Sequence, residues 1–247
     1  MQEHEQIISL KGVYKNFGAK QVLRGVNLDI QKGETLVVLG RSGCGKSVTL
    51  KALLGLLRVD RGSIQIYGQD ITKLSEKSLF DIRRKFGMLF QGGALFDSMT
   101  VGENVAFALT EFSDKSNEEI AEIVHKNLLF VDLKGTENLM PSELSGGMKK
   151  RAALARAMAY QPKIMLYDEP TTGLDPITAT TINALIRKTQ KQHNVTSIVV
   201  THELDSGFSV ADRVAVMDEG AILEIGTIDE IKASKNQFVQ TFIAGPK

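Results

Sequence analysis

The stretch GRSGCGKS at residues 40–47 decides the fold, because it matches the pattern G-x-x-x-x-G-K-[ST], which has a physical mechanism attached. A strand-like apolar run precedes it at residues 35–39, and a helical pattern runs from Ser47 to about Leu57. Its three glycines allow the tight turn in which successive amide N–H groups surround a phosphate, and the positive end of the new helix points to the same place. The stretch therefore predicts a site for a nucleotide triphosphate.

Every residue of this loop is assigned to the nucleotide site. Lys46 is expected to reach the terminal phosphates, and the hydroxyl of Ser47 is expected to bind Mg²⁺. Cys44 is interpreted as a small residue that fits the loop; the alternative is a redox switch, since a helix N-terminus lowers the pKa of a neighbouring thiol. The remaining residues assigned to the nucleotide are Gly40, Arg41, Ser42, Gly43, Gly45 and Val48.

The composition limits the classes of protein to consider. With 247 residues, 43% of them hydrophobic, the chain is long enough for a substantial core. Its 30 basic and 29 acidic residues nearly balance, so electrostatics gives no reason to propose a nucleic-acid or membrane-surface partner. The single cysteine excludes an internal disulfide framework and fits a reducing compartment. We expect no signal peptide and no transmembrane helix, which needs roughly 18 apolar residues, so any work on a membrane is expected to go through another chain.

The apolar periodicity predicts alternating strands and helices. Strands are predicted at residues 7–13 and 21–30, joined by the turn KNFGAK, and at 35–39, 63–67, 86–90, 164–167 and 196–202, with a hairpin at 213–226. Helices are predicted at 47–57, 79–85, 176–192 and 204–211, between 94 and 159, and in the C-terminal NQFVQTFIAGPK. The alternation implies an α/β fold with a mostly parallel sheet covered on both faces. One folded unit, 1–247, is predicted, with a helical subdomain at 94–161 inserted into a core of residues 1–93 and 162–247.

The segment IMLYDEP supplies the acid that a phosphate loop needs for its metal. A buried strand at residues 164–167 brings Asp168 to its carboxyl end, where open α/β sheets bind their ligands, so Asp168 is expected to hold Mg²⁺ through water. Glu169 is expected to point to the opposite face of the strand and to polarise an attacking water. The alternative is a pair of acids that are merely solvated in a loop.

Between these two motifs stands LSGGM at residues 144–148, which opens the helix MKKRAALARA. The arrangement resembles the signature of the ATP-binding cassette (ABC) family, usually LSGGQ, and the resemblance covers nearly the whole chain. It implies a P-loop NTPase (RecA-like) core with a mostly parallel sheet, an antiparallel β subdomain near the N-terminus and an inserted ABC α-helical subdomain. It also implies an ATP hydrolase that uses ATP and Mg²⁺. Met148 replaces the family's glutamine, and activity is expected to be retained because the residues that face the phosphate remain.

Three further residues match positions of the ABC motifs. Phe17, in K-x-F-G, matches the aromatic residue that stacks on adenine, with Tyr14 as the alternative. Gln91 matches the residue of the glutamine loop, which implies a role at Mg²⁺ and in catalysis. His202 matches the switch histidine that touches the γ-phosphate. Each match alone would be an ordinary core or surface residue, and their common order and spacing carry the resemblance.

The signature also implies a dimer. Ser145, Gly146 and Gly147 lie at a helix start, where amides and a hydroxyl form a second anion site, and the family places this site against the ATP of a facing cassette. Asp175, in TGLD, matches the loop that crosses to the partner. Two copies related by a two-fold axis would bury two ATP molecules. The basic run KKR at residues 149–151 is interpreted as a solvated helix face rather than a nucleic-acid patch.

Within the ABC family, the sequence is most similar to the ATPase subunits of Mce/Mla-type phospholipid transporters. The stretches that carry this are FQGGALFDSMTVGENVAFAL, ELSGGMKKRAALARA and DEPTTGLDPITA. The first lies where ABC ATPases receive the coupling helix of a membrane partner, and a helix cap at Ser98 or Thr100 fits that surface. The resemblance implies a second copy of the chain, an integral-membrane permease, a lipid-binding Mce-domain protein and a small regulatory subunit as partners, and no nucleic acid. It implies a peripheral protein on the cytoplasmic face of the inner (plasma) membrane.

Two alternatives stay open at this point. The ATPase of a solute importer, for amino acids or metals, would share every nucleotide motif and differ only in its permease. A soluble ABC protein of translation, DNA repair or cluster assembly is the third hypothesis. The single cassette, the lack of a long coiled-coil insertion and the near-zero net charge argue against it.

Overall fold

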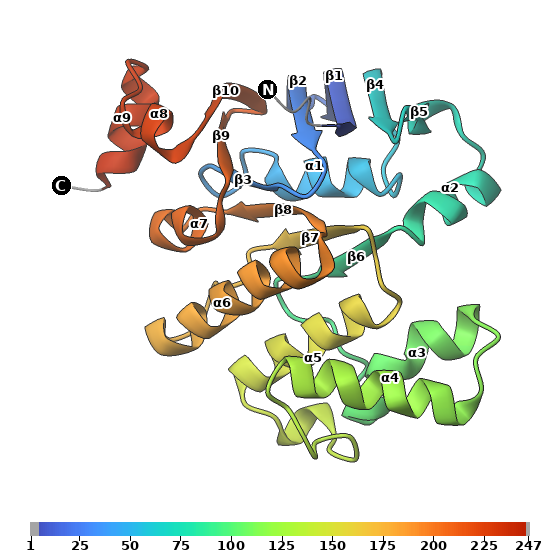
Figure 1. Ribbon diagram of the computed structural model, residues 1–247. Helices are drawn as coiled ribbons and strands as arrows, with labels where there is room; N and C mark the ends of the chain where they lie inside the picture. Colours follow the sequence, from blue (N-terminus) through green and yellow to red (C-terminus); the bar gives the residue numbers. More distant parts are fainter. Residues whose placement is uncertain (1–4, 246–247) are drawn as a thin grey trace.

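Two β-sheets organise the computed structural model, which describes residues 5–245 (Figure 1). The smaller sheet is antiparallel, with the order β2 (Lys20–Gln31), β1 (Gln6–Phe17), β4 (Arg61–Ile66) and β5 (Gln69–Asp70). Phe17 pairs with Lys20, so the first three residues of the predicted turn KNFGAK belong to β1, and that turn was predicted too long. The tighter turn forms because Gly18 adopts a φ of 58°, in the left-handed region that glycine enters without a Cβ clash.

The larger sheet has six strands and carries the parallel core. Its order is β10-β9-β3-β8-β7-β6, and every neighbouring pair is parallel except β10 with β9. The predicted α/β fold, with an antiparallel sheet beside a mostly parallel one, is confirmed. The strands are β3 (Thr35–Leu39), β6 (Phe86–Leu89), β7 (Ile164–Asp168), β8 (Thr196–Thr201), β9 (Arg213–Asp218) and β10 (Ala221–Gly226).

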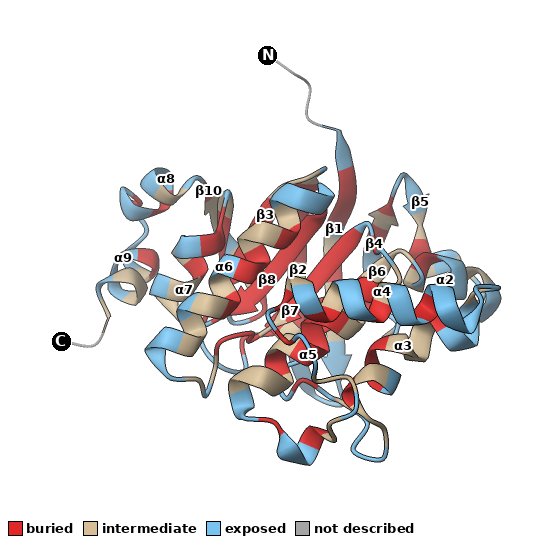
Figure 2. Ribbon diagram, turned by 60° about the horizontal axis from the view of Figure 1, so that its bottom comes forward, coloured by how far each residue is buried: buried red, intermediate tan, exposed pale blue. Residues whose placement is uncertain are grey.

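Helices cover both faces of the larger sheet. On one face lies α1, and on the other lie α5 and α7. The α-helices of the described residues are α1 (Lys46–Leu53), α2 (Glu76–Arg83), α3 (Val101–Phe112), α4 (Asn117–Phe130), α5 (Gly146–Ala159), α6 (Pro176–His193), α7 (Leu204–Val210), α8 (Ile228–Lys232) and α9 (Gln237–Ala244). Alternate residues of β3 serve two cores: Leu36 and Val38 pack with α1 and the antiparallel sheet, whereas Val37 and Leu39 pack with the helices of the other face. Because β3 is buried on both faces (Figure 2), its sequence is apolar throughout.

Helices α3, α4 and α5 form a layer at the end of the molecule opposite the antiparallel sheet (Figure 1). Thr100 caps α3: its hydroxyl accepts from Glu103 N at 3.2 Å, and the Glu103 carboxylate accepts from Thr100 N at 2.7 Å. Thr100, rather than Ser98, is therefore the cap. The assignment of 94–161 as an inserted subdomain stays a prediction.

Two predicted helices have other ends than expected. α1 ends at Leu53 rather than near residue 57, because Gly55 adopts a φ of 61°. α2 begins at Glu76 rather than at residue 79, because the Ser75 hydroxyl accepts from Ser78 N and caps the helix. Within residues 5–245, no helix combines the length and the apolar character needed to cross a bilayer.

Candidate functional site

The carboxyl ends of four parallel strands converge on one hollow of about 240 Å³. The segments after β3, β6, β7 and β8 all contribute to it, and β2 closes one side. Its lining residues are Val22, Ser42, Gly43, Gly45, Lys46, Ser47, Val48, Gln91, Glu169 and His202. The tertiary fold thus brings the glycine loop, the glutamine, the acid and the histidine of the sequence motifs together.

The glycine loop has a backbone that other residues could not adopt. Gly43 and Gly45 have φ angles of 79° and 114°, which L side chains rarely tolerate. Gly40 has no such angle, but a Cβ at this position would lie only 2.3 Å from the carbonyl oxygen of Met217. Glycine is therefore required at two positions for conformation and at one for space.

Lys46 is buried at the start of α1. Its Nζ donates to the carbonyl oxygens of Gly40 at 2.7 Å and Arg41 at 3.0 Å, and lies 3.5 Å from Oε1 of Glu169. The ammonium group is thus held at the mouth of the glycine loop. There it can meet an anion that binds to the loop amides.

Ser47 and Asp168 join the first turn of α1 to the end of β7. The Ser47 hydroxyl donates to Oδ1 of Asp168 at 2.8 Å. Burial raises the pKa of Asp168, and the hydrogen bond from Ser47 opposes that rise. A hydroxyl and a carboxylate oxygen side by side are the oxygen ligands that Mg²⁺ prefers, so these residues fit that metal.

Glu169 does not follow the predicted strand geometry. β7 ends at Asp168, and Glu169 has a φ of 48°, so strand alternation does not set its direction and its carboxylate turns into the hollow. The prediction that it points to the opposite face of the strand was wrong. Its Oε2 lies 2.9 Å from Nδ1 of His202. Burial opposes ionisation of Glu169, but the hydrogen bond to His202 and the charge of Lys46 outweigh it and hold the pKa of this carboxyl below its usual range.

Two contacts to Glu169 come from residues that the sequence analysis did not assign to the site. The Thr172 hydroxyl donates to Oε2 at 3.0 Å, which fixes the carboxylate from its own loop. The Nζ of Lys150 donates to the Glu169 carbonyl oxygen at 3.3 Å, from helix α5. Side chain and backbone of Glu169 are therefore both held.

The interpretation of the run at residues 149–151 as a solvated helix face was wrong. Lys150 is buried, and the Arg151 guanidinium donates to two carbonyl oxygens in the segment after α4. The signal in the sequence was the helical spacing. Lys150 lies three and four residues before Ala153 and Leu154, both buried, and therefore on the same face of α5.

Two loop residues have surroundings that the motif does not describe. The Arg41 guanidinium stacks over the ring of Phe238 in α9, 5.0 Å from its centroid, so its side chain is turned away from the loop. Cys44 is buried, and burial raises the pKa of its thiol. A protonated, buried thiol agrees with a small packing residue rather than a redox switch.

The two aromatic candidates for adenine differ in their surroundings. Phe17 lies at the tip of the β1–β2 hairpin and is 49% exposed. Tyr14 is partly buried, and its ring lies against Gly25: a Cβ added to Gly25 would lie 2.7 Å from the Tyr14 hydroxyl. Phe17 therefore presents a ring on which a base can stack, and Tyr14 does not.

The residues assigned to a second nucleotide do not line the hollow. Ser145 and Asp175 are N-caps: the Ser145 hydroxyl accepts from Met148 N at 3.3 Å, and Asp175 Oδ1 accepts from Thr178 N at 3.0 Å. Gly146 and Gly147 form the first turn of α5, where backbone N–H groups can meet an anion. At the start of α6, Pro176 has no N–H and the Ile177 N–H also donates to Asp175, so the group there that can meet a second copy is the side chain of Asp175 itself.

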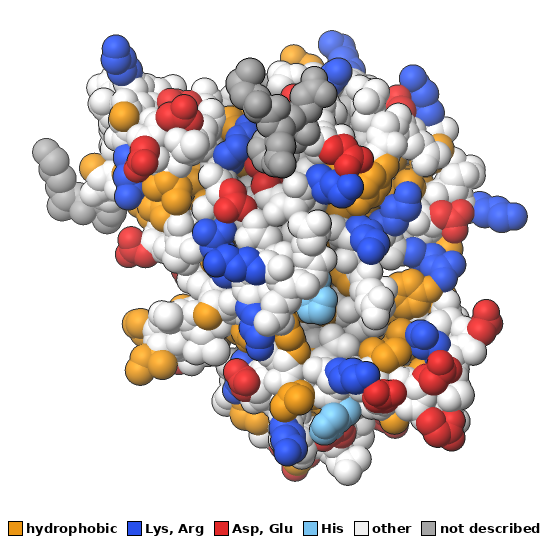
Figure 3. All heavy atoms as spheres, viewed as in Figure 1, with side chains coloured by type: hydrophobic (Ala, Val, Ile, Leu, Met, Phe, Trp, Pro, Cys, Tyr) orange, Lys and Arg blue, Asp and Glu red, His pale blue; other side chains and the backbone are white. Residues whose placement is uncertain are grey.

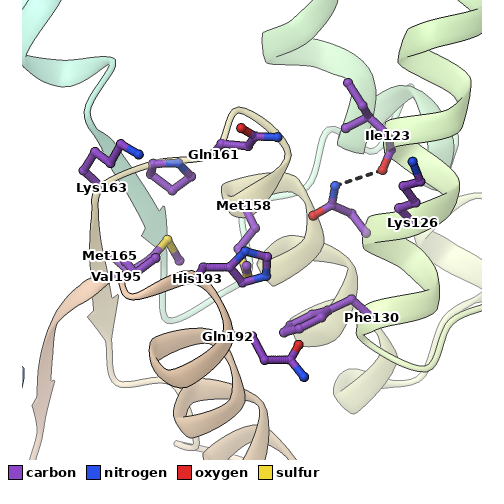
Figure 4. A pocket seen from close by; sticks show the side chains of 12 residues that line it. Ile123, Lys126, Phe130, Met158, Gln161, Lys163, Met165, Gln192, His193 and Val195 are labelled. Atoms are coloured by element: carbon purple, nitrogen blue, oxygen red, sulfur yellow. Dashed lines mark hydrogen bonds between the residues drawn. The ribbon is translucent and has the colours of Figure 1, made fainter. Parts of the chain in front are cut away.

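A larger hollow, of about 530 Å³, lies at the opposite, amino end of the sheet (Figure 4). Its floor is apolar, with Met158, Met165 and Val195, and the rings of His193 and Phe130 meet edge to face beside it. The lining contains no acidic residue and no glycine. The chemistry of the sequence motifs therefore lies in the smaller hollow.

Comparison with known families identifies the arrangement. The family model described as "ABC transporter" matches residues 23–172, more than half of the chain, and spans both the glycine loop and the acid pair. The chain belongs to the ABC transporter family. As an ABC-type cassette it is an ATP hydrolase, in agreement with the geometry of the hollow.

Relatives of this ABC cassette cover nearly the whole chain. The "Probable ribonucleotide transport ATP-binding protein mkl" of Mycobacterium leprae is 44% identical over 96% of the chain and 69% of its own length. The "Intermembrane phospholipid transport system ATP-binding protein MlaF" of Haemophilus influenzae is 38% identical over 98% of the chain and 92% of its own length. Among solved structures, the dimeric post-hydrolysis state of the ATP-binding cassette MJ0796, bound to ADP and Pi, is 32% identical with a TM-score of 0.83 and covers 90% of this chain and 99% of that one.

Proposed function

We propose that this ABC cassette hydrolyses ATP to drive phospholipid or related lipid transport between membranes, through a separate permease of a Mce/Mla-type system. The observation that carries the proposal is the convergence of the glycine loop, Asp168 and Glu169 on one hollow. The similarity to MlaF of Haemophilus influenzae over 98% of the chain supports the lipid cargo.

ATP is assigned to the glycine loop, residues 40–48, and to Phe17. The loop amides and the N-terminus of α1 bind the phosphates, and Lys46 moves from the loop carbonyls to the terminal phosphates. The exposed ring of Phe17 stacks on the adenine.

Ser47, Asp168 and Gln91 are the residues that would hold Mg²⁺. Ser47 and Asp168 already share a hydrogen bond, and Gln91 lines the same hollow. Bound Mg²⁺ supplies positive charge that offsets the negative charge of the phosphates.

Hydrolysis is assigned to Glu169 and His202. Glu169 is ionised and buried beside Lys46, so its carboxylate can accept a proton from the attacking water. Nδ1 of His202 is occupied by Glu169, which leaves Nε2 of the same ring to meet the γ-phosphate. The Thr172 hydroxyl keeps the carboxylate in place during this step.

Two copies of the chain are required for a complete site. Ser145, Gly146, Gly147 and Asp175 lie outside their own hollow, and we assign them to the ATP of a facing copy. Ile177, two residues after Asp175, is 82% exposed, as expected for an apolar residue that a second copy covers. The dimeric cassette MJ0796 supports this arrangement. ATP closes the two cassettes, and hydrolysis reopens them.

The permease is expected to dock near α2 and α3. Figure 3 shows exposed hydrophobic side chains in this region of the molecule, among basic and acidic ones, and further hydrophobic side chains elsewhere on the viewed face. The exposed aromatic residues here are Phe80, Phe90, Phe96 and Phe112. An amphipathic coupling helix would cover them. We further propose a Mce-domain protein and a regulatory subunit as partners, and a peripheral position on the cytoplasmic face of the inner membrane.

The test is affinity purification of the tagged chain from its own membranes in mild detergent, with mass spectrometry of proteins and lipids and an untagged strain as control. Recovery of a small permease, a Mce-domain protein and bound phospholipid would support the proposal. Recovery from the soluble fraction without a membrane partner would contradict it.

A solute importer is the second candidate, because the Mycobacterium leprae relative carries a name that refers to ribonucleotide transport. The same purification separates the two. An importer permease with a solute receptor would keep the ATPase chemistry and replace the cargo.

A further inference from the structure

A buried lysine of helix α5, Lys150, contacts the backbone of Glu169. Lys150 is only 6% exposed, and its Nζ donates to the Glu169 carbonyl oxygen at 3.3 Å. No ion pair found within residues 5–245 includes it. Burial lowers the pKa of Lys150, and the charges of Asp168, Glu169 and Glu203 oppose that drop. A buried ammonium group without a hydrogen-bond acceptor is costly. The position of Lys150 therefore depends on the Glu169 carbonyl oxygen that accepts its hydrogen bond.

The backbone of Glu169 needs support from its neighbours. Its φ of 48° lies in the left-handed region, which is strained for a residue with a Cβ and is maintained where surrounding contacts over-determine it. The Glu169 N–H donates to the carbonyl oxygen of Val200 in β8 at 2.9 Å, and the Glu169 carbonyl accepts from Lys150 in α5. The two polar backbone atoms of this residue are therefore held by two different elements.

The helix that carries Lys150 also begins at the signature. Ser145 is the N-cap of α5, and Lys150 follows five residues later, about 7.5 Å along the helix axis at 1.5 Å per residue. Under the proposed function, Ser145 contacts the ATP of the facing copy. A little more than one helical turn then separates that contact from the carboxylate loop of the same chain.

We propose that Lys150 is a positioning residue for hydrolysis, which holds Glu169 in the orientation that accepts the proton of water and transmits engagement of α5 with the partner's ATP to this carboxylate. The inference rests on the proposed function, namely on the role of Glu169 and on the dimer. Lys150 does not line the hollow assigned to ATP, so ATP affinity should not depend on it.

The test is Lys150→Met, which keeps an apolar stem of similar length and removes the donor and the charge. We expect kcat to fall about 10²-fold, the order of loss that a misplacement of about 1 Å causes, while KM and the Kd of a fluorescent ATP analogue change by less than about two-fold. The Hill coefficient for ATP should fall toward 1, because the two sites lose their coupling. Lys150→Arg keeps a donor and should recover most of kcat.

Lys149→Met on the same helix is the matched control and should keep the kcat and the Hill coefficient of the unmodified protein. Glu169→Gln, measured in parallel, separates the two levels of the argument. If Glu169→Gln hydrolyses ATP slowly while Lys150→Met keeps full turnover, this inference alone is overturned. If Glu169→Gln itself keeps full turnover, the proposed role of Glu169 is overturned. A joint loss of ATP affinity, unfolding temperature and kcat in Lys150→Met, without recovery in Lys150→Arg, would show a merely structural lysine.

Discussion

The two ends of the six-stranded sheet differ in kind. The hollow at the amino end, of about 530 Å³, exceeds the hollow of about 240 Å³ that holds the motif residues, yet its floor is apolar and its lining carries no acid. At the carboxyl end, Lys46, Asp168 and Glu169 are crowded together, and Glu169 has a left-handed backbone. Opposite charges brought out of water on a strained backbone are costly for a fold, and such features gather at functional sites. Convergent charge, rather than volume, therefore distinguishes the site of this protein from the hollow at the amino end.

The amino end also contains an acid, but this acid stabilises the fold. Asp212 precedes β9; its carboxylate accepts from Thr35 N at 2.8 Å and from Arg187 at 2.9 Å, and it also accepts from Gln190. Burial opposes ionisation of Asp212, but the Thr35 N–H and Arg187 outweigh it and hold the pKa of this carboxyl below its usual range. Both oxygens of this carboxylate have partners within the chain, which ties it to the strand β3 and the helix α6.

Glu169→Gln should have the largest effect on the carboxyl end. The amide keeps the size of the side chain but cannot accept a proton, so kcat should fall roughly 10²–10⁴-fold. ATP binding should persist, and size-exclusion chromatography with ATP should show a stable dimer. Turnover equal to that of the unmodified protein would remove Glu169 from the role of base.

Lys46→Ala should come next. Loss of the buried ammonium removes the positive charge at the terminal phosphates, and kcat should fall roughly 10²–10³-fold together with ATP affinity. Calorimetric titration with ATP and a phosphate-release assay check the two effects. Unchanged affinity and rate would mean that the glycine loop is not the nucleotide site.

Asp212→Ala should affect stability and leave catalysis intact. The mutation leaves the buried Thr35 N–H without its acceptor, which costs about 1–3 kcal/mol of unfolding free energy at pH 7. Because the pKa of Asp212 is lower in the folded state, its contribution is full above the unfolded value of about 4 and is lost as the pH falls through the folded value. Urea unfolding at several pH values should show that the unfolding free energies of the unmodified protein and of Asp212→Ala approach each other at acidic pH. A large loss of kcat in a folded Asp212→Ala would contradict the separation of the two ends.

The smallest effects are expected at the hollow of the amino end. Lys163→Ala and His193→Ala alter exposed lining residues at the amino end, so the ATPase rate should change by less than about two-fold and the unfolding free energy by about 0.5 kcal/mol or less. Phosphate release and urea unfolding measure both. A ten-fold loss of rate without loss of stability would mean that the hollow of the amino end takes part in turnover.

Local chemistry made much of the site predictable. The glycine loop could be identified because its conformation depends on a few glycines and on the strand and helix beside it. Asp168 could be assigned because a short buried strand determines where its carboxyl end lies. The position of Gln91 and His202 in the hollow could be expected only from the family pattern, since each follows a different strand.

The sequence by itself determined the α/β class, the mostly parallel sheet covered on both faces and the family, since these follow from residue type and spacing along the chain. Tertiary structure decided the direction of Glu169. Its N–H donates to a carbonyl oxygen of β8, and its carbonyl oxygen accepts from Lys150 of α5. Tertiary structure also decided the burial of Lys150 and the turn of Arg41 toward Phe238, a residue near the far end of the chain. The physical reason is the same in each case: these side chains are placed by neighbours from distant segments, and no local preference records such contacts.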